Sequence, residues 1–362
     1  MPKIIAVEAN PYNVPLSSGL SWGKGHHLAT LQHVLIRIIL SDGAEGIAES
    51  TPRPTIYGET QASVQAMIEH HLAPILLGED LNTRKDIDLL DQQLSIIKNN
   101  HTAKGALNMA LHLALAQSKE HSIRDWLGIT KKQVRVSYIV GTGDENTVIA
   151  DVNEAYQVGV RVFKVKIGKN LTQEIQIIQA LQLQFPDAEF YADANQCLTI
   201  ENGESQLNHL YELGILWCEE PLPVHLLNER HQLRQITKMP IIADDSAFTL
   251  EETKREIAFD TFDILNIKTA RTGFSQSQAM LNASIQADKQ VMVGSQASSL
   301  LGCLHTALFA GLDGIDCASE CTFFLKIDSD LAIPIIDGCL DLDIAEMTLE
   351  QLSWQTMTQE RF

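Results

Sequence analysis

The chain has 362 residues, of which 45% are hydrophobic and 20% are charged. This is the balance of a folded globular protein and excludes a fully disordered chain. The formal net charge of −19 argues against nucleic-acid binding, because contacts to phosphates need a basic surface. No stretch approaches the ~18 uncharged apolar residues of a membrane span, and the first ten residues lack the apolar core of a signal peptide. We therefore expect a soluble, cytoplasmic protein that binds neither nucleic acid nor membrane.

The first third of the chain mixes strand and helix patterns. Three runs with β-branched residues predict a small antiparallel sheet: Lys3–Val14, His33–Ile39 and Gly46–Glu49. Apolar residues three and four positions apart predict helices over Thr60–Ile75, Arg84–Ile97 and Ala103–Ala116. These patterns predict an N-terminal α+β domain over residues 1–128.

From about Val134 a regular alternation of short apolar runs and helix-like segments begins. The runs start near Val134, Val162, Glu189, Ile215, Pro240, Asp263, Gln290 and Gly314. Eight strand–helix units predict a parallel α/β fold, and their number and length suit a closed (β/α)₈ TIM-type barrel over residues 129–332. No GxGxxG fingerprint of a dinucleotide-binding fold is present. The C-terminal tail, residues 333–362, is expected to pack onto the N-terminal domain.

Ionisable residues recur at the predicted carboxyl ends of five consecutive barrel strands, where barrel enzymes carry their active sites. They are Lys166, Asp193, Glu219, Asp244 and Lys268, spaced 27, 26, 25 and 24 residues apart. Lys164 precedes Lys166 by two positions on the same strand, so both side chains should point into the barrel mouth.

The three carboxylates would repel one another in a dry site unless a cation lies between them. Mg²⁺ prefers oxygen ligands and keeps some positions for water or substrate, so the pattern predicts a Mg²⁺ site. In the alternative, each acid simply pairs with a neighbouring lysine or arginine. That alternative explains a single residue better than it explains a matched set of three.

The two lysine strands, the second and the sixth of eight, are expected to face each other across the barrel. A substrate held at the metal would then have a lysine on each face. Such a pair removes a proton from one face of a carbon and returns it to the other, while the metal stabilises the developing enolate. A lysine beside a dication and a second lysine is also expected to have a lowered pKa.

These motifs resemble those of the enolase superfamily, in particular its muconate-lactonizing-enzyme subgroup. The matching text is Lys164-Val165-Lys166, Asp193-Ala194-Asn195-Gln196, Glu219-Glu220-Pro221, Ala243-Asp244-Asp245-Ser246 and Asn266-Ile267-Lys268. The resemblance covers nearly the whole chain, because this family also has an N-terminal α+β capping domain. It implies the following roles: Asp193, Glu219 and Asp244 as Mg²⁺ ligands, Lys166 and Lys268 as the acid/base pair, and Lys164 as a neighbour that lowers the pKa of Lys166.

Within the subgroup, the segment Glu49–Thr60 is similar to that of dipeptide epimerases, which invert one α-carbon of a dipeptide such as Ala-Glu. Those enzymes usually carry Asp-x-Asp at the end of strand eight, where this chain has Ala318-Ser319-Glu320. Ser298 stands where they usually have an acid. A lone glutamate at the end of strand eight is similar to muconate cycloisomerases. The resemblance implies these substrate-binding residues: Trp22, His26, Asn195, Asp245, Ser295, Ser298 and Glu320.

In this family, loops of the capping domain close over the barrel and set specificity, and the matching loop here is Ser17–Ala29. Its glycines permit movement. We predict a Mg²⁺-dependent racemase or epimerase of a small molecule, foremost a dipeptide, working as a homo-oligomer. The alternatives are a muconate-type cycloisomerase or an o-succinylbenzoate synthase on the same scaffold, and a catalytically inactive barrel kept for binding.

Overall fold

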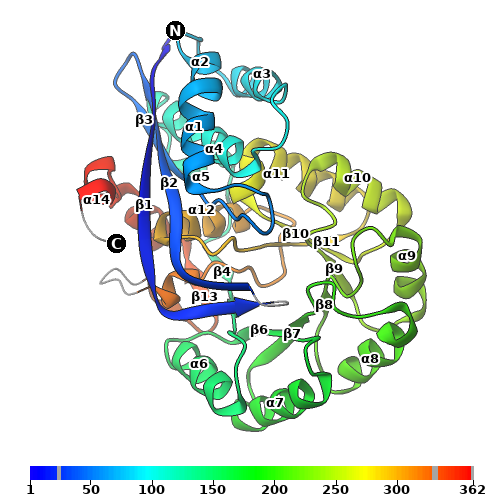
Figure 1. Cartoon of the computed structure of the whole chain (residues 1–362). Coiled ribbons are helices and arrows are strands. Elements are labelled where there is room, and N and C mark those ends of the chain that lie inside the picture. Colours follow the sequence, from blue (N-terminus) through cyan, green and yellow to red (C-terminus); the bar gives the residue numbers. More distant parts are fainter. Residues whose placement is uncertain (23–25, 328–332, 360–362) are drawn as a thin grey trace.

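The structure, a computed structural model, describes residues 1–22, 26–327 and 333–359. Three antiparallel strands form the N-terminal sheet, in the order β1 (Ile4–Trp22), β2 (His26–Leu40) and β3 (Glu45–Ser50). Gly43 turns the chain between β2 and β3 at φ +90°, a conformation that glycine adopts without steric cost. The β1–β2 hairpin reaches from this sheet to the barrel, where Leu16 pairs with Ile327 (Figure 1).

The expected loop over Ser17–Ala29 is largely strand where the structure describes it. Ser21 pairs with His27 and Trp22 pairs with His26 across the hairpin. The loop prediction was wrong because glycine and serine content indicates local flexibility, whereas the two consecutive strands β1 and β2 pair with each other and their backbone hydrogen bonds override it. Residues 23–25 lie outside the described part of the chain.

Helices cover one side of this sheet. They are α1 (Gln61–Met67), a π-helical turn (Ile68–Leu72), α2 (Ala73–Leu76), α3 (Arg84–Leu94), α4 (His101–Ser118) and α5 (Ile123–Leu127). Thr60 starts α1 with a capping box, in which its side chain accepts from the Ser63 N–H and Ser63 Oγ accepts from the Thr60 N–H. Helix α4 lies so close to β3 that a Cβ on Gly46 would stand 2.0 Å from the carbonyl oxygen of Ala110.

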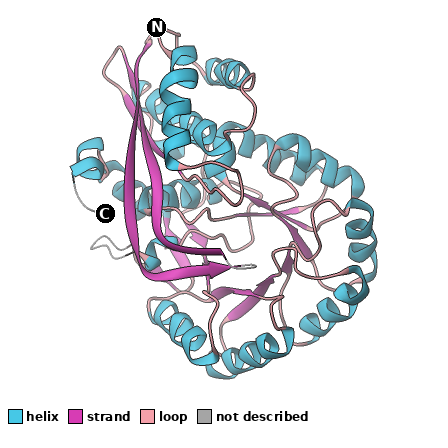
Figure 2. Cartoon of the chain, in the orientation of Figure 1, coloured by secondary structure: helices cyan, strands magenta, loops and turns pink. Residues whose placement is uncertain are grey.

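The second domain is a curled parallel sheet enclosed by helices (Figure 2). Its seven strands run in the order β11-β10-β9-β8-β7-β6-β5. They are β5 (Ser137–Ile139), β6 (Val162–Lys166), β7 (Glu189–Asp193), β8 (Cys218–Glu219), β9 (Ile241–Ala243), β10 (Ile264–Ile267) and β11 (Gln290–Val293). The helices are α6 (Glu145–Gln157), α7 (Leu171–Gln184), α8 (Ile200–Glu212), α9 (Leu227–Ile236), α10 (Leu250–Phe259), α11 (Thr269–Gln286) and α12 (Leu300–Ala310). The α/β barrel fold with an N-terminal α+β domain is thereby confirmed.

The eighth strand is shorter than the prediction, which began it near Gly314 and ended it at Ala318-Ser319-Glu320. Only that predicted end, at Ser319 and Glu320, closes the sheet. The Glu320 N–H donates to Val293 O of β11, and the Ser137 N–H of β5 donates to Ser319 O. Residues near Gly314 form a turn because Gly314 itself adopts φ +88°, which a strand does not accommodate.

The C-terminal segment contacts both halves of the molecule. After a 3₁₀ turn (Phe323–Lys326) come β12 (Ile335–Ile336), β13 (Cys339–Asp341), α13 (Leu342–Gln351) and α14 (Trp354–Gln359). Strand β13 pairs with β4 (Gln133–Arg135), while the Arg37 guanidinium lies 4.7 Å from the ring centroid of Trp354. The boundaries at residues 128 and 332 stay a prediction.

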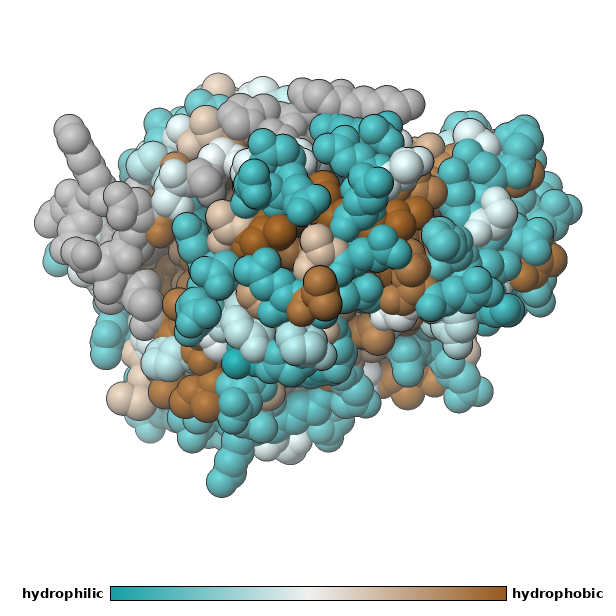
Figure 3. Space-filling model, turned by 90° about the horizontal axis from the view of Figure 1, so that it is seen from below, coloured by the Kyte–Doolittle hydropathy of each residue, from teal (hydrophilic) through white to brown (hydrophobic). Residues whose placement is uncertain are grey.

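The outer surface is dominated by hydrophilic side chains on the face shown in Figure 3, with hydrophobic residues in small groups between them. No helix in the described ranges is long and apolar enough to cross a membrane.

Candidate active site

The site rests on an apolar plug inside the barrel. One buried side chain from each of several strands forms it: Val162, Tyr191, Ile242, Ile264, Met292 and Ala318. Two residues further along each strand the side chain points the same way again. This register places these polar or small residues in the next layer: Lys164, Asp193, Asp244, Asn266, Gly294 and Glu320. The alternation of the strands therefore stacks a charged layer directly on an apolar floor.

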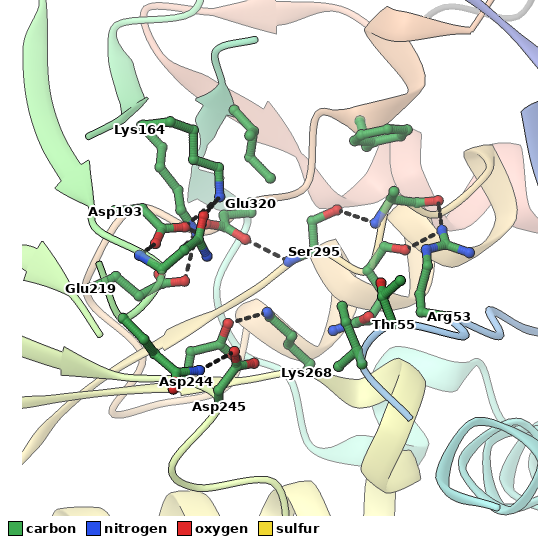
Figure 4. Close-up of a pocket in the computed structure, with 18 of the residues that line it drawn as sticks. Arg53, Thr55, Lys164, Asp193, Glu219, Asp244, Asp245, Lys268, Ser295 and Glu320 are labelled. Carbon is green, nitrogen blue, oxygen red and sulfur yellow. Dashed lines mark hydrogen bonds and ion pairs between the residues drawn. The ribbon is translucent and has the colours of Figure 1, made fainter. Parts of the chain in front are cut away.

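The charged layer opens into a cavity of about 390 Å³ at the carboxyl ends of the strands (Figure 4). All six residues predicted for catalysis and metal binding line it. Parallel pairing aligns them, because Lys166 is the partner of Asp193, and Asp193 is the partner of Glu219. Segment 53–56 of the capping domain and Phe323 of the 3₁₀ turn complete the wall.

Each lysine of the site contacts carboxylates. Lys166 Nζ lies 2.5 Å from Asp193 Oδ2, and Lys268 Nζ donates to Asp244 Oδ2. Lys164 Nζ lies 2.8 Å from Glu219 Oε1, 2.6 Å from Glu320 Oε1 and 3.2 Å from Asp193 Oδ2. Lys164 therefore sits at the centre of the carboxylates.

Negative charge dominates this layer. Burial opposes the charged form of Lys164, but Glu219 and Glu320 outweigh it and hold the pKa of Lys164 well above its ordinary value. Burial likewise opposes the charge of Lys268, and Asp244 raises the pKa of Lys268. Burial raises the pKa of Glu219. The neighbouring carboxylates raise it further, and together these effects outweigh Lys164, which lowers it. The protein's own charges thus raise the pKa of Lys164 and of Lys268, and a cation bound beside them would act in the opposite direction.

The donor set fits a hard divalent cation. Asp193, Glu219 and Asp244 are at most 4% exposed and present carboxylate oxygens on three adjacent strands, the ligand chemistry that Mg²⁺ prefers. In the part of the chain that the structure describes, no three ligating side chains already converge on one point. Their oxygens point to lysines instead (Figure 4), so holding the cation requires rotation of these side chains.

The residues implied for substrate binding fall into three groups. Four of them line the cavity: Asn195, Asp245, Ser295 and Glu320. Both carboxylate oxygens of Glu320 already accept hydrogen bonds. Lys164 and the Tyr191 hydroxyl donate to Oε1, and the Ser295 N–H donates to Oε2. Ser298 is buried and does not line the cavity. The side chains of Trp22 and His26 lie outside the described part of the structure.

Three further residues hold carboxylates of the site in place. Asn266 Nδ2 donates to Glu219 Oε2 at 3.1 Å, and Arg271 Nη1 lies 3.0 Å from Asp244 Oδ1. Tyr191 donates to Glu320. The same alternation that located Lys164 also points to Asn266, two residues before Lys268. Arg271 gave no such signal, because it lies in the helix that follows the strand.

A buried network joins the capping domain to the barrel loop after β11. Arg53 Nη2 donates to Gln296 O at 2.6 Å and Ala297 O at 3.0 Å, and lies 3.2 Å from His33 Nε2. Because arginine only donates, His33 Nε2 accepts and its Nδ1–H donates to Glu49 at 3.1 Å. Burial lowers the pKa of Arg53 to about 10, so the guanidinium stays charged at neutral pH.

Fold and site together define a capped barrel enzyme with carboxylates and lysines at the mouth of the barrel. Residues 147–342 match the family model of enolase C-terminal domain-like proteins. Residues 22–128 match the N-terminal domain of mandelate racemase and muconate lactonizing enzyme. The chain belongs to this family of the enolase superfamily, and it is an enzyme of the isomerase class.

Relatives in this family include epimerases and a lactonizing enzyme. L-Ala-D/L-Glu epimerase of Bacillus subtilis is 29% identical over 313 residues, 85% of either chain. Its substrate-liganded structure matches with a TM-score of 0.87 over 94% of this chain and 96% of that one. Muconate lactonizing enzyme of Mycobacterium smegmatis, complexed with muconolactone, is 30% identical over 94% of both chains, with a TM-score of 0.88. Dipeptide epimerase of Cytophaga hutchinsonii, complexed with Mg and D-Ala-L-Val, is 26% identical over 94% of this chain and 93% of that one, with a TM-score of 0.85.

Proposed function

We propose that the protein is a Mg²⁺-dependent racemase or epimerase that moves the α-proton of a carboxylate or amide substrate, foremost a dipeptide. The observation that carries this proposal is the order of the site. Carboxylates stand at the carboxyl ends of the three strands β7 to β9, and lysines stand at the carboxyl ends of the two strands that flank them, β6 and β10. Dipeptide substrates are supported by the names of the relatives in Bacillus subtilis and Cytophaga hutchinsonii.

The lysines divide the proton transfer between two sides of the substrate. Lys166 Nζ takes the α-proton from one face, and Lys268 Nζ delivers a proton to the other, so the carbon inverts. Lys164 holds Glu219 and Glu320 in place rather than touching the reacting carbon. Asp193, Glu219 and Asp244 would hold Mg²⁺, which when bound stabilises negative charge on the substrate oxygens.

The test is deuterium uptake from D₂O with Mg²⁺ and a pooled set of L,L- and L,D-dipeptides, read by mass. We expect a gain of one mass unit in particular dipeptides and inversion of the same residue. Lys166→Ala and Lys268→Ala should each lower inversion by about 10²-fold or more, while each retains exchange from the face that keeps its lysine. Lys169→Ala is the matched control, since Lys169 is an exposed lysine near the barrel mouth that does not line the cavity. Full two-way inversion by Lys268→Ala would refute the two-base scheme.

A cycloisomerase is the second candidate, because the muconate lactonizing enzyme of Mycobacterium smegmatis is as similar as the epimerases and Glu320 replaces the Asp-x-Asp pair. The same preparation distinguishes the two. Loss of muconate absorbance that disappears in Lys166→Ala, together with no deuterium uptake in any dipeptide, would establish the cycloisomerase. We also propose a homo-oligomeric assembly and a cytoplasmic location, and light scattering tests the assembly.

A further inference from the structure

Arg53 is a buried cation on the wall of the active-site cavity. It is 5% exposed and lines the cavity together with Thr55 and Ile56. It comes from the capping domain, and its Nη2 holds two carbonyl oxygens of the barrel loop, Gln296 O and Ala297 O. Its Nη1 donates to the neighbouring carbonyl oxygen of Pro52, at 2.7 Å.

This charge has no anionic partner among the described residues. Arg53 makes no ion pair there, whereas Lys164, Lys166 and Lys268 of the same cavity all do. The nearest acid in its network, Glu49, is separated from it by the His33 ring and already accepts from Tyr12, His33 and Ser299. A buried cation is ordinarily paired with an anion, because the free energy lost on removing the charge from water exceeds the free energy gained from hydrogen bonds to neutral groups.

Two of the five N–H groups of Arg53 also have no hydrogen-bond acceptor among the described residues. The Nη2 group serves the loop carbonyls, and one Nη1 hydrogen serves Pro52, so Nε–H and the second Nη1 hydrogen make no hydrogen bond to a described residue. Nε–H and Nη1–H lie on different edges of the guanidinium, so each can donate a single charge-assisted hydrogen bond to an anion.

Arg53 lies across the cavity from the reaction centre. In Figure 4, Lys164, Asp193 and Glu219 stand on one side, Arg53 and Thr55 on the other, and Ser295 lies between. A continuous chain of contacts spans the wall: the Ser295 N–H donates to Glu320, the Ala297 N–H to Ser295 Oγ, and Arg53 to Ala297 O. A molecule that reaches from the carboxylate cluster to Arg53 meets opposite charges at its two ends.

We propose that Arg53 is a specificity residue that binds a second carboxylate, at the end of the substrate remote from the α-carbon. The inference rests on the proposed function and narrows its substrate class to molecules with two carboxylates. That second carboxylate belongs to an acidic side chain of a dipeptide or to an acyl group on the amino nitrogen. A cavity of about 390 Å³ admits either of these small molecules.

The test compares matched charged and neutral substrates. One pair is L-Ala-L-Glu and L-Ala-L-Gln, and the other is N-succinyl-L-alanine and its terminal amide. For each compound, kcat/KM for deuterium uptake and the Kd from calorimetry with Mg²⁺ are measured in wild type, Arg53→Met and Arg53→Lys. We expect the wild type to prefer the charged member of one pair by about tenfold or more. That pair identifies the source of the carboxylate. Arg53→Met should abolish the preference and Arg53→Lys should keep part of it.

Ser299→Ala separates recognition from structure. Ser299 Oγ donates to Glu49 and so also ties the capping domain to the loop after β11, but its loss changes no charge at the cavity. The Ser299→Ala variant should lower kcat/KM by the same factor for the charged and the neutral substrate of a pair. A wild type without charge preference in both turnover and binding, or a preference that survives in Arg53→Met, overturns the role of Arg53. Charge-selective binding without any deuterium uptake would overturn the epimerase instead and leave the Arg53 site standing.

Discussion

Asn266 and Gly294 show how tightly single residues are fitted beneath the site. Asn266 is fully buried and donates to Glu219, while its Oδ1 has no partner among the described residues. Gly294 follows the neighbouring strand, and a Cβ there would stand 2.1 Å from Asn266 Oδ1. Glycine at 294 is therefore required for room and not for a special backbone conformation.

We expect Gly294→Ala to displace Asn266 and release Glu219. The overlap should reduce deuterium uptake by about tenfold or more and lower the free energy of unfolding by about 1–3 kcal/mol. Urea unfolding and the exchange assay measure the two effects. Adding Asn266→Ala makes the test specific, because the double variant should then be no less active than Asn266→Ala alone. Additive losses would show that Gly294 acts through some other neighbour.

At the scale of elements, helix α4 of the capping domain shapes the helix that begins at Lys268. Helix α11 breaks at Gly273, with φ 64° and ψ −173°. There Asn108 Oδ1 of α4 accepts from the N–H groups of Phe274 and Ser275, at 2.7 and 3.1 Å. A side chain of one domain thus acts as the N-cap for the second part of a helix in the other.

Gly105 brings the two helices together at the same place. A Cβ at Gly105 would lie 2.9 Å from Ala270 O and 3.0 Å from the carbonyl carbon of Arg271. Both of these residues lie within three positions of Lys268, at the start of α11. We expect Gly105→Ala to shift the start of α11 and lower kcat about tenfold, because a misplaced base loses its alignment with the substrate.

Gly203→Ala is the matched control for this helix pair. Gly203 lies in α8, where a Cβ would meet Leu233 Cδ1 at an ordinary 3.5 Å. This variant should raise the free energy of unfolding by about 0.5–1 kcal/mol through helix propensity and leave kcat unchanged. Equal kcat values for the two variants would contradict a role for the α4–α11 contact in placing Lys268.

At the scale of the whole molecule, uncharged histidines are buried where the capping domain meets the barrel. His305 of α12 is fully buried, and neither ring nitrogen has a partner among the described residues. Burial lowers its pKa to about 4, against a smaller raising effect of Glu49. Burial also lowers the pKa of His112 to about 3.

The sign of the pH effect follows from these lowered values. Below about pH 6.5 the unfolded chain takes up a proton at each histidine, whereas the folded chain does so only near pH 4 or 3. Each neutral buried histidine therefore makes its full contribution to the free energy of unfolding above about pH 6.5. This contribution is lost as the pH falls toward the pKa of the histidine in the folded protein. Asp91 and Glu220, whose pKa values burial raises to about 7, act in the opposite sense, so the total stability does not isolate the histidines.

A difference between two variants isolates His305. His305→Leu should be the more stable protein at pH 7.5, by about 1–3 kcal/mol, because it removes unsatisfied buried polar atoms. Its advantage should grow by up to about 1.4 kcal/mol per pH unit between pH 6.5 and 4.5. Urea unfolding of both proteins at pH 7.5, 6.0 and 5.0 measures this. An advantage that stays constant with pH would mean that His305 is protonated or hydrated in the folded protein.

The sequence by itself determined the barrel, the capping domain and the charged layer at the barrel mouth. These features depend on local geometry: a strand repeats its side-chain direction every two residues, and a strand–helix unit repeats at nearly constant length. Lys166, Asp193, Glu219, Asp244 and Lys268 could therefore be predicted to lie together at the barrel mouth from their spacing. The family resemblance added the expected roles of those residues.

Only the tertiary structure decided the features that depend on contacts between segments far apart in the sequence. Arg53 faces the cavity because the capping domain lies against a loop that is 243 residues further along the chain. The bridge between Leu16 and Ile327, the closing segment at Ser319 and the cap from Asn108 likewise arise from contacts between distant segments. Local patterns carry no record of such contacts, because their energy appears only when two separate surfaces meet and exclude water.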